Sequence, residues 1–104
     1  YPEGFYIKNA TWYTRLFQDP AFVSKVKERF NHFYALKDDI YREINENADY
    51  LKYSIIENDA KWGILYQYKW PNHAIWGSYD NEVQQLKRYI DDRIEWLKAE
   101  FDKM

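Results

Sequence analysis

The sequence contains no cysteine, few glycines and prolines, and no long apolar run. Without cysteine, a disulfide framework and thiolate chemistry are both excluded. Three glycines and three prolines in 104 residues are too few for a turn-rich or disordered chain. No apolar run approaches the roughly 18 residues that a membrane-spanning helix needs, so we expect no membrane span.

A predominance of charge of one sign is also lacking. Fifteen basic and 17 acidic residues give a net charge of −2, and the two kinds alternate along the chain. No basic field is present to gather phosphates, so nucleic acid is not an expected partner. The chain opens with neither an initiator methionine nor a signal-peptide pattern, and we therefore interpret it as a piece of a longer protein.

Apolar and aromatic side chains are abundant, at 46% and 21% of the residues, and their spacing predicts helices. Asp19-Pro20 is the clearest helix start. An aspartate oxygen accepts from the free amides of a first helical turn, and proline there gives up no hydrogen bond. Before this start, residues 10–17 are predicted to form a short helix whose Trp12, Leu16 and Tyr13 pack inward.

Two further stretches repeat apolar residues every three or four positions. The first predicts a helix from Asp38 or Asp39 to about Asp59, and leaves open whether it continues directly from the helix before it. The second predicts a helix that starts after Ser78, a good cap, and runs to the end of the chain. Between them, residues 62–77 lose the periodicity and hold three tryptophans, two glycines and a proline, which predicts an ordered loop pinned by aromatics. A short strand at residues 63–68 is the alternative there.

Helices that each carry a single apolar stripe satisfy one another by packing together. The predicted fold class is therefore all-α, a small bundle of three to four helices with an aromatic-rich loop at about residues 62–77. We expect residues 1–104 to form a single helical domain.

Residues capable of catalysis lack partners at useful spacing. His32 and His73 lie far apart and match no metal-ligand spacing. Adjacent carboxylates on a helix point about 100° apart, so the two Asp-Asp pairs cannot share a proton. Arginines Arg15, Arg29 and Arg93 lie within a turn of apolar positions, and we expect a carboxylate or an aromatic face beside each. We predict no catalytic, cofactor-binding or metal-ligating residue in these 104 residues.

Tryptophans Trp62, Trp70 and Trp76 of the loop allow two interpretations. They could form a stacking platform for sugar rings, with Trp70, His73 and Trp76 as ligand-contacting residues. The other interpretation is that they plug the open end of the core, as loop aromatics of small bundles commonly do.

Three groups of residues resemble, in order, the closing region of the CotH (spore-coat-protein-H-like) kinase family. The first is the pattern W-x(3)-L-F-x-D-P-x-F, the second is N-x(2)-K-W, and the third lies on the last predicted helix. In this sequence the groups are Trp12, Leu16, Phe17, Asp19, Pro20 and Phe22 followed by Val26 and Arg29; Asn58, Lys61 and Trp62; and Glu82, Val83, Leu86, Lys87, Arg93, Trp96 and Leu97.

The resemblance implies an atypical protein kinase, secreted or associated with the cell surface, that uses ATP and a divalent metal. Relatives occur in spore coats and on microbial cell surfaces. In the family the nucleotide and metal ligands lie upstream of the region seen here, and none of them transfers to a residue of this chain. The implied role is a non-catalytic C-terminal helical segment whose partner is the upstream catalytic region of the same protein. The alternative function is a carbohydrate- or protein-binding module that uses the loop tryptophans.

Overall fold

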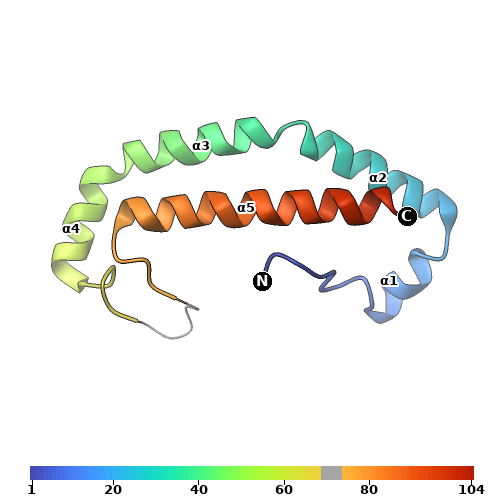
Figure 1. Ribbon diagram of the computed structural model, residues 1–104, viewed down its shortest axis with the longest axis horizontal. Coiled ribbons are helices and arrows are strands. Elements are labelled where there is room, and N and C mark those ends of the chain that lie inside the picture. Colours follow the sequence, from blue (N-terminus) through green and yellow to red (C-terminus); the bar gives the residue numbers. More distant parts are fainter. Residues whose placement is uncertain (69–73) are drawn as a thin grey trace. The chain divides into compact units, whose positions relative to one another are not determined.

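The computed structural model describes residues 1–68 and 74–104, which form five helices (Figure 1). The helices are α1 (Thr11–Leu16), α2 (Pro20–Tyr34), α3 (Lys37–Tyr50), α4 (Lys52–Trp62) and α5 (Tyr79–Asp102). No strand occurs in the described residues, and the predicted all-α class is confirmed. The strand considered at residues 63–68 is wrong, because this stretch forms a turn closed by a hydrogen bond from the amide of Gln67 to the carbonyl of Ile64.

The helix starts predicted at Asp19-Pro20 and after Ser78 are confirmed. In each case the side chain of the residue just before the helix caps its first turn. The Asp19 Oδ1 atom accepts from the amide of Ala21 at 2.9 Å, and Pro20 occupies the first helical position of α2. At the start of α5, the Ser78 Oγ atom accepts from the amide of Asn81 at 3.1 Å. These caps satisfy amides that would otherwise have no partner, so local sequence fixes where α2 and α5 begin.

The single helix predicted to reach about Asp59 is wrong, because it is two helices. Leu51 separates α3 from α4 with φ −90° and ψ 0°. Its amide still donates to the carbonyl of Asn47, and its carbonyl still accepts from the amide of Ile55, both at 2.9 Å. The hydrogen-bond ladder therefore continues while the ψ of one residue leaves the helical range, which produces a bend without glycine or proline. The second helix of the pair then extends to Trp62, three residues beyond the predicted end.

Helices α2 and α3 are two separate helices, a point that the sequence left open. They are separated at Ala35 and Leu36, where the amide of Leu36 donates to the carbonyl of Phe33, three residues back. Such tightened bonds are common in the last turn of a helix. The third helix then begins at Lys37, one residue before the predicted start.

The chain divides into two compact units, which are described separately below. Unit 1 comprises Tyr1–Asp38 and Ile90–Met104, and unit 2 comprises Asp39–Tyr89. Helices α3 and α5 have residues in both units.

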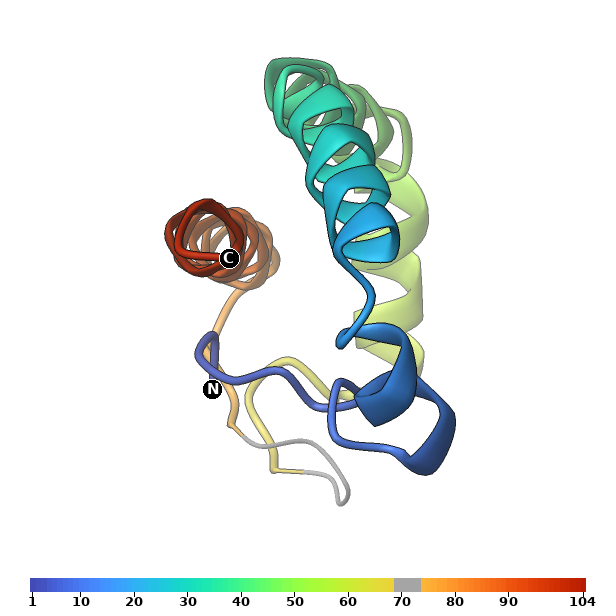
Figure 2. The same cartoon turned by 90° about the vertical axis from the view of Figure 1, so that its right-hand side faces the viewer.

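In unit 1, α2 and the C-terminal part of α5 run antiparallel, as Figures 1 and 2 show. Contacts confirm the direction: Tyr34 of α2 meets Glu95, Phe30 meets Phe101, and Lys27 meets Met104. Ile94, on this part of α5, is only 4% exposed and is the buried apolar residue of the described chain.

Helix α1 departs from its predicted packing. The short helix exists, but Trp12 is 82% exposed, and Leu16 and Tyr13 are also exposed. The inward packing predicted for Trp12 and Leu16 is therefore wrong, whereas Tyr13, although 41% exposed, lines an apolar hollow of unit 1. An apolar pattern shows which face of a helix favours burial, but the residues of that face are buried only where a neighbouring element lies against them.

Unit 2 is held by polar contacts between the end of α3 and the start of α5. The Tyr79 hydroxyl donates to the carbonyl of Ala48 at 3.0 Å, and Lys87 Nζ donates to Asn45 Oδ1 at 2.9 Å. Several aromatic side chains of this unit are exposed: Tyr50, Tyr53, Trp62, Tyr66 and Tyr68. None of the described helices is long and apolar enough to cross a membrane.

Candidate functional site

Arg93 of α5 holds the N-terminal segment of the chain. One guanidinium nitrogen donates to the carbonyl of Pro2 at 2.8 Å and to that of Gly4 at 2.6 Å. The same guanidinium lies over the Tyr6 ring at 5.1 Å and over the Trp96 ring at 5.4 Å. The expected aromatic face beside Arg93 is thus present, while main-chain carbonyls take the place of a carboxylate. A charged donor to two carbonyls is among the stronger kinds of hydrogen bond.

The ring of Phe5 packs the N-terminal segment against α5. Its centroid lies 5.0 Å from that of Trp96, nearly edge-on, and 5.2 Å from that of Phe101. The Tyr6 hydroxyl donates back to the carbonyls of Tyr1 and Glu3, so the segment folds on itself before it reaches α1. The family-motif residue Trp96 therefore has a structural role, since it forms one wall of the socket for Phe5.

An apolar hollow of about 270 Å³ lies behind this socket in unit 1. Its walls come from the N-terminal segment, α1, α2 and α5. Phe22, another motif residue, lines the hollow and meets Phe17 edge-on at 5.3 Å between ring centroids. The remaining walls include Phe5, Val26, Leu97 and Phe101.

A polar cluster joins the start of α3 to α5 within unit 1. Lys37 Nζ lies 2.8 Å from Glu95 Oε1, and the Tyr34 hydroxyl donates to the same oxygen at 2.9 Å. These hydrogen bonds, first that from Lys37, hold the pKa of the Glu95 carboxyl below its usual value of 4.5. The hydrogen bond to Glu95 in turn raises the pKa of Lys37 above its usual value. The cluster is partly solvated, which identifies it as a local tether between helices.

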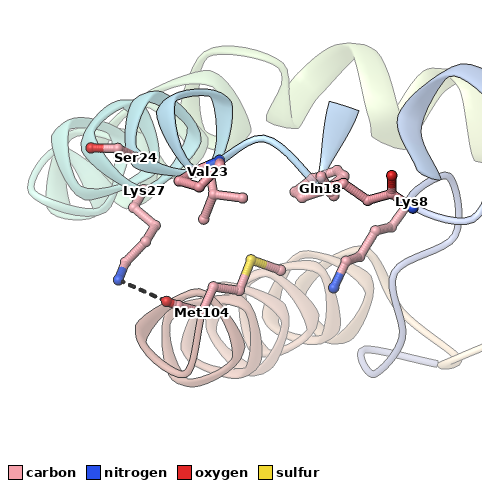
Figure 3. A pocket seen from close by; sticks show the side chains of 8 residues that line it. Lys8, Gln18, Val23, Ser24, Lys27 and Met104 are labelled. Atoms are coloured by element: carbon pink, nitrogen blue, oxygen red, sulfur yellow. Dashed lines mark hydrogen bonds between the residues drawn. The ribbon is translucent and has the colours of Figure 1, made fainter. Parts of the chain in front are cut away.

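A second pocket, of about 560 Å³, lies between the end of α1, the first turns of α2 and the end of α5 (Figure 3). Lys8 and Lys27 supply its charged groups, and Phe17, Val23 and Met104 supply apolar walls. No acidic residue is among those that line it. Lys27 Nζ donates to the main-chain oxygen of Met104 at 3.4 Å, and Lys8 Nζ lies 5.3 Å from the centroid of the Phe17 ring.

Of the residues predicted to contact a ligand, Trp70 and His73 lie outside the described residues. Trp62 and Trp76 lie within them. Trp76 is held by its backbone: its amide donates to Glu82 Oε1 at 2.9 Å, and its carbonyl accepts from the side chain of Asn81 at 3.0 Å. Its side chain remains 46% exposed. Trp62, at the end of α4, is 62% exposed, with Lys61 Nζ 5.0 Å from the centroid of its ring. Ligand contact by Trp70, His73 and Trp76 stays a prediction.

Other residues singled out by the sequence are dispersed. Arg15 donates to Gln18 Oε1 at 2.7 Å, where a carboxylate or a ring was expected. Arg29 is exposed and makes no ion pair within residues 1–68 and 74–104, and His32 is exposed as well. No group of three potential metal ligands occurs in the part of the chain that the structure describes.

Sequence reasoning missed Phe5, Lys8 and Lys27. Phe5 lies in a segment without periodicity, and its partners follow it by more than 90 residues. The two lysines are among 15 basic residues, and only folding distinguishes them from the others. The aromatic, positively charged start of the chain, from Phe5 to Lys8, was the one available signal.

Comparison with known proteins gives one result. The model of a family described as CotH kinase protein matches residues 1–97. No curated protein and no solved structure matches the chain.

Proposed function

The chain belongs to the CotH kinase protein family, and on that basis we propose that it is a non-catalytic helical segment that supports the catalytic region of a longer CotH-like protein. The catalytic region would carry the ligands for ATP and a divalent metal. The helical segment would contribute surface and rigidity to it. A secreted or cell-surface location is part of the same proposal.

The observation that carries this proposal is the exposure of Trp12. This residue opens the first family motif, yet it is 82% exposed on α1, and Tyr6, Ile7 and Leu16 of the same unit are exposed too. Soluble proteins seldom leave large apolar patches uncovered unless another surface packs on them. A neighbouring part of the same protein would supply that surface.

The test compares one substitution in two contexts. Trp12→Ala in the longer protein should lower the free energy of unfolding by roughly 3 kcal/mol, because a packed tryptophan is lost, and should reduce phosphotransfer. In the 104-residue chain alone the same change should cost less than about 0.5 kcal/mol, as expected for an exposed position. Thermal unfolding and a phosphotransfer assay measure both effects.

Thr14→Ala, also exposed on α1, is the matched control and should leave both proteins unchanged. Equal effects of Trp12→Ala in the two contexts would contradict the proposal. So would phosphotransfer by the 104-residue chain alone.

Trp76 favours a second candidate function, a carbohydrate- or protein-binding module. Its backbone is fixed by α5 while nearly half of its side chain faces solvent, an arrangement suited to stacking on a ligand ring. Titration of cell-wall and plant polysaccharides should then change the tryptophan fluorescence of the chain and of Trp12→Ala, but not that of Trp76→Ala. An unchanged spectrum with every polysaccharide would remove the carbohydrate form of this candidate.

A further inference from the structure

The triplet Asn9-Ala10-Thr11 has a pattern that the proposed function does not use. It is the only place in the sequence where serine or threonine follows an asparagine by two positions, and the residue between them is not proline. Such a triplet is the site at which N-linked glycans are attached in secreted proteins. Three residues match by chance in many proteins, so the exposure of the triplet and its part in the fold decide its meaning.

The triplet lies at the surface, just before the first regular turn of α1. Asn9 and Thr11 are both exposed. Asn9 lies in a turn closed by a hydrogen bond from the amide of Ala10 to the carbonyl of Ile7 at 3.0 Å. Ala10 is extended, with φ −66° and ψ 152°, and the helix begins at Thr11. Asn9 is therefore accessible on an irregular stretch of chain, where modified and enzyme-contacting residues are commonly found.

The fold has no evident need of an asparagine at position 9. Asparagine is favoured in turns because it tolerates a left-handed backbone and because its side chain bonds nearby backbone groups. Only glycines have a positive φ in the part of the chain that the structure describes, and the Asn9 side chain makes no hydrogen bond there. Nor does Asn9 cap α1, because the capping position is taken by Ala10 and no side chain bonds the first turn.

The hydroxyl of Thr11 is likewise without a structural role. Threonine is a weaker helix former than most residues, and in a helix its hydroxyl often bonds a carbonyl of the preceding turn. The Thr11 hydroxyl makes no hydrogen bond to residues 1–68 or 74–104. A hydroxyl two positions after the asparagine is what the glycosylation pattern requires. Both residues that define the triplet therefore keep their polar groups available to an enzyme.

We propose that Asn9 is a site of N-linked glycosylation. The inference rests on the secreted or cell-surface location that belongs to the proposed function, since the transferring enzyme meets only chains that enter the secretory route. It does not depend on the support of a catalytic region. Asn9 then faces solvent in the longer protein as well.

The reaction transfers an oligosaccharide from a polyprenyl pyrophosphate carrier to the side-chain amide of Asn9. A bond forms between Asn9 Nδ2 and the anomeric carbon of the first sugar. The bond between that carbon and the pyrophosphate oxygen breaks, and polyprenyl pyrophosphate leaves with its electron pair. The amide nitrogen gives up a proton to a base of the transferring enzyme, and nothing is oxidised or reduced.

The experiment uses the longer protein isolated from the cells that make it. Treatment of the intact protein with a peptide-N-glycosidase in heavy-oxygen water converts a glycosylated asparagine to labelled aspartate. Trypsin then cleaves after Lys8 and Arg15 and releases residues 9–15, in which Asn9 is the only asparagine. Mass spectrometry should find labelled aspartate at position 9, and the enzyme should also remove a single step of mobility on a denaturing gel.

Variants of the same protein locate the chemistry. Asn9→Gln and Thr11→Val should each abolish the glycosidase-sensitive step, whereas Thr11→Ser restores the hydroxyl and should retain it. Thr14→Val, also exposed on α1 but outside the triplet, is the matched control and should be modified like the unchanged protein. Circular dichroism establishes that each variant is folded.

Unmodified Asn9 in protein recovered from outside the cell or from its surface would overturn this inference alone. Modification that persists in Thr11→Val would also overturn it, because the glycan would then not follow the triplet. Protein found only in the cytoplasm would overturn the location and this inference together. The support of a catalytic region is tested separately by Trp12→Ala, so its failure is distinguishable from each of these results.

Discussion

The two units differ in what their aromatic side chains contact. In unit 1 the rings of Phe5, Trp96, Phe101 and Phe30 meet one another at centroid distances of 4.9 to 5.2 Å. In unit 2 the aromatic residues of α4 and the following loop are largely exposed, with Tyr53 at 72%. The N-terminal segment, α2 and α5 converge at these four rings in unit 1, so each of the four packs on another, whereas Trp12 of the same unit is 82% exposed. Aromatic content alone therefore does not make a core, because several elements have to meet at one place.

The comparison predicts that unit 1 depends strongly on single rings. Phe101→Ala should lower the free energy of unfolding by about 3 kcal/mol, because the ring packs on both Phe5 and Phe30. Denaturant unfolding followed by circular dichroism measures this change. Tyr53→Ala in unit 2 is the control, with an expected cost below about 0.5 kcal/mol. Similar losses for the two variants would erase the distinction between the units.

The next largest effect concerns the polar side of unit 1. Arg93→Met keeps the apolar stem but removes the hydrogen bonds to Pro2 and Gly4, and should cost about 2 kcal/mol. The released N-terminal segment should also become more sensitive to limited proteolysis. Arg88→Met, an exposed position on the same helix, should change neither quantity. Unchanged cleavage in Arg93→Met would mean that ring packing alone holds the segment.

A smaller effect is expected in unit 2. Tyr79→Phe removes the hydrogen bond to the carbonyl of Ala48 and should cost about 1 kcal/mol. Hydrogen exchange should quicken around Ala48 more than in α2, since the bond lies within unit 2. Tyr89→Phe is the matched control on the same helix. A uniform change in exchange across both units would show that they unfold together, which would weaken the comparison.

The smallest effect is the pH dependence of the polar cluster in unit 1. The pKa of Glu95 is lowered by its hydrogen bonds with Lys37 and Tyr34, so the unfolded chain binds a proton more readily than the folded one. The stabilisation is therefore fully present above the usual value of 4.5 and is lost as the pH falls below it. The melting temperature of the chain should exceed that of Glu95→Gln at pH 6, and the two should converge as the pH falls below 4.5. A gap that stays constant over this range would contradict the assignment.

Features that depend on neighbouring residues could be predicted from the sequence. Asp19 and Ser78 cap α2 and α5 because a short side chain reaches amides two or three residues ahead. The break at Leu51 could not be predicted, since no glycine or proline marks it and only one ψ angle departs from the helix. Propensity and periodicity describe a helix face but do not report such a bend.

Contacts between distant residues were beyond prediction. The spacing around Arg93 indicated a structural partner, but not that the partners would be carbonyls at Pro2 and Gly4. Trp12 shows the opposite error, because its pattern favours burial and no described element covers it. For both residues, the sequence reports what a side chain prefers to contact, and only the fold determines what is within its reach.

The tie between Arg93 and the carbonyl of Pro2 also has a consequence for synthesis of the protein. The two residues are separated by 91 positions, so the first residues leave the ribosome long before their partner exists. At roughly 5 to 20 residues per second, the wait lasts on the order of 5 to 20 s. During that time the ring of Phe5 has neither Trp96 nor Phe101 to pack on. The beginning of this sequence is therefore among the last parts of unit 1 to fold.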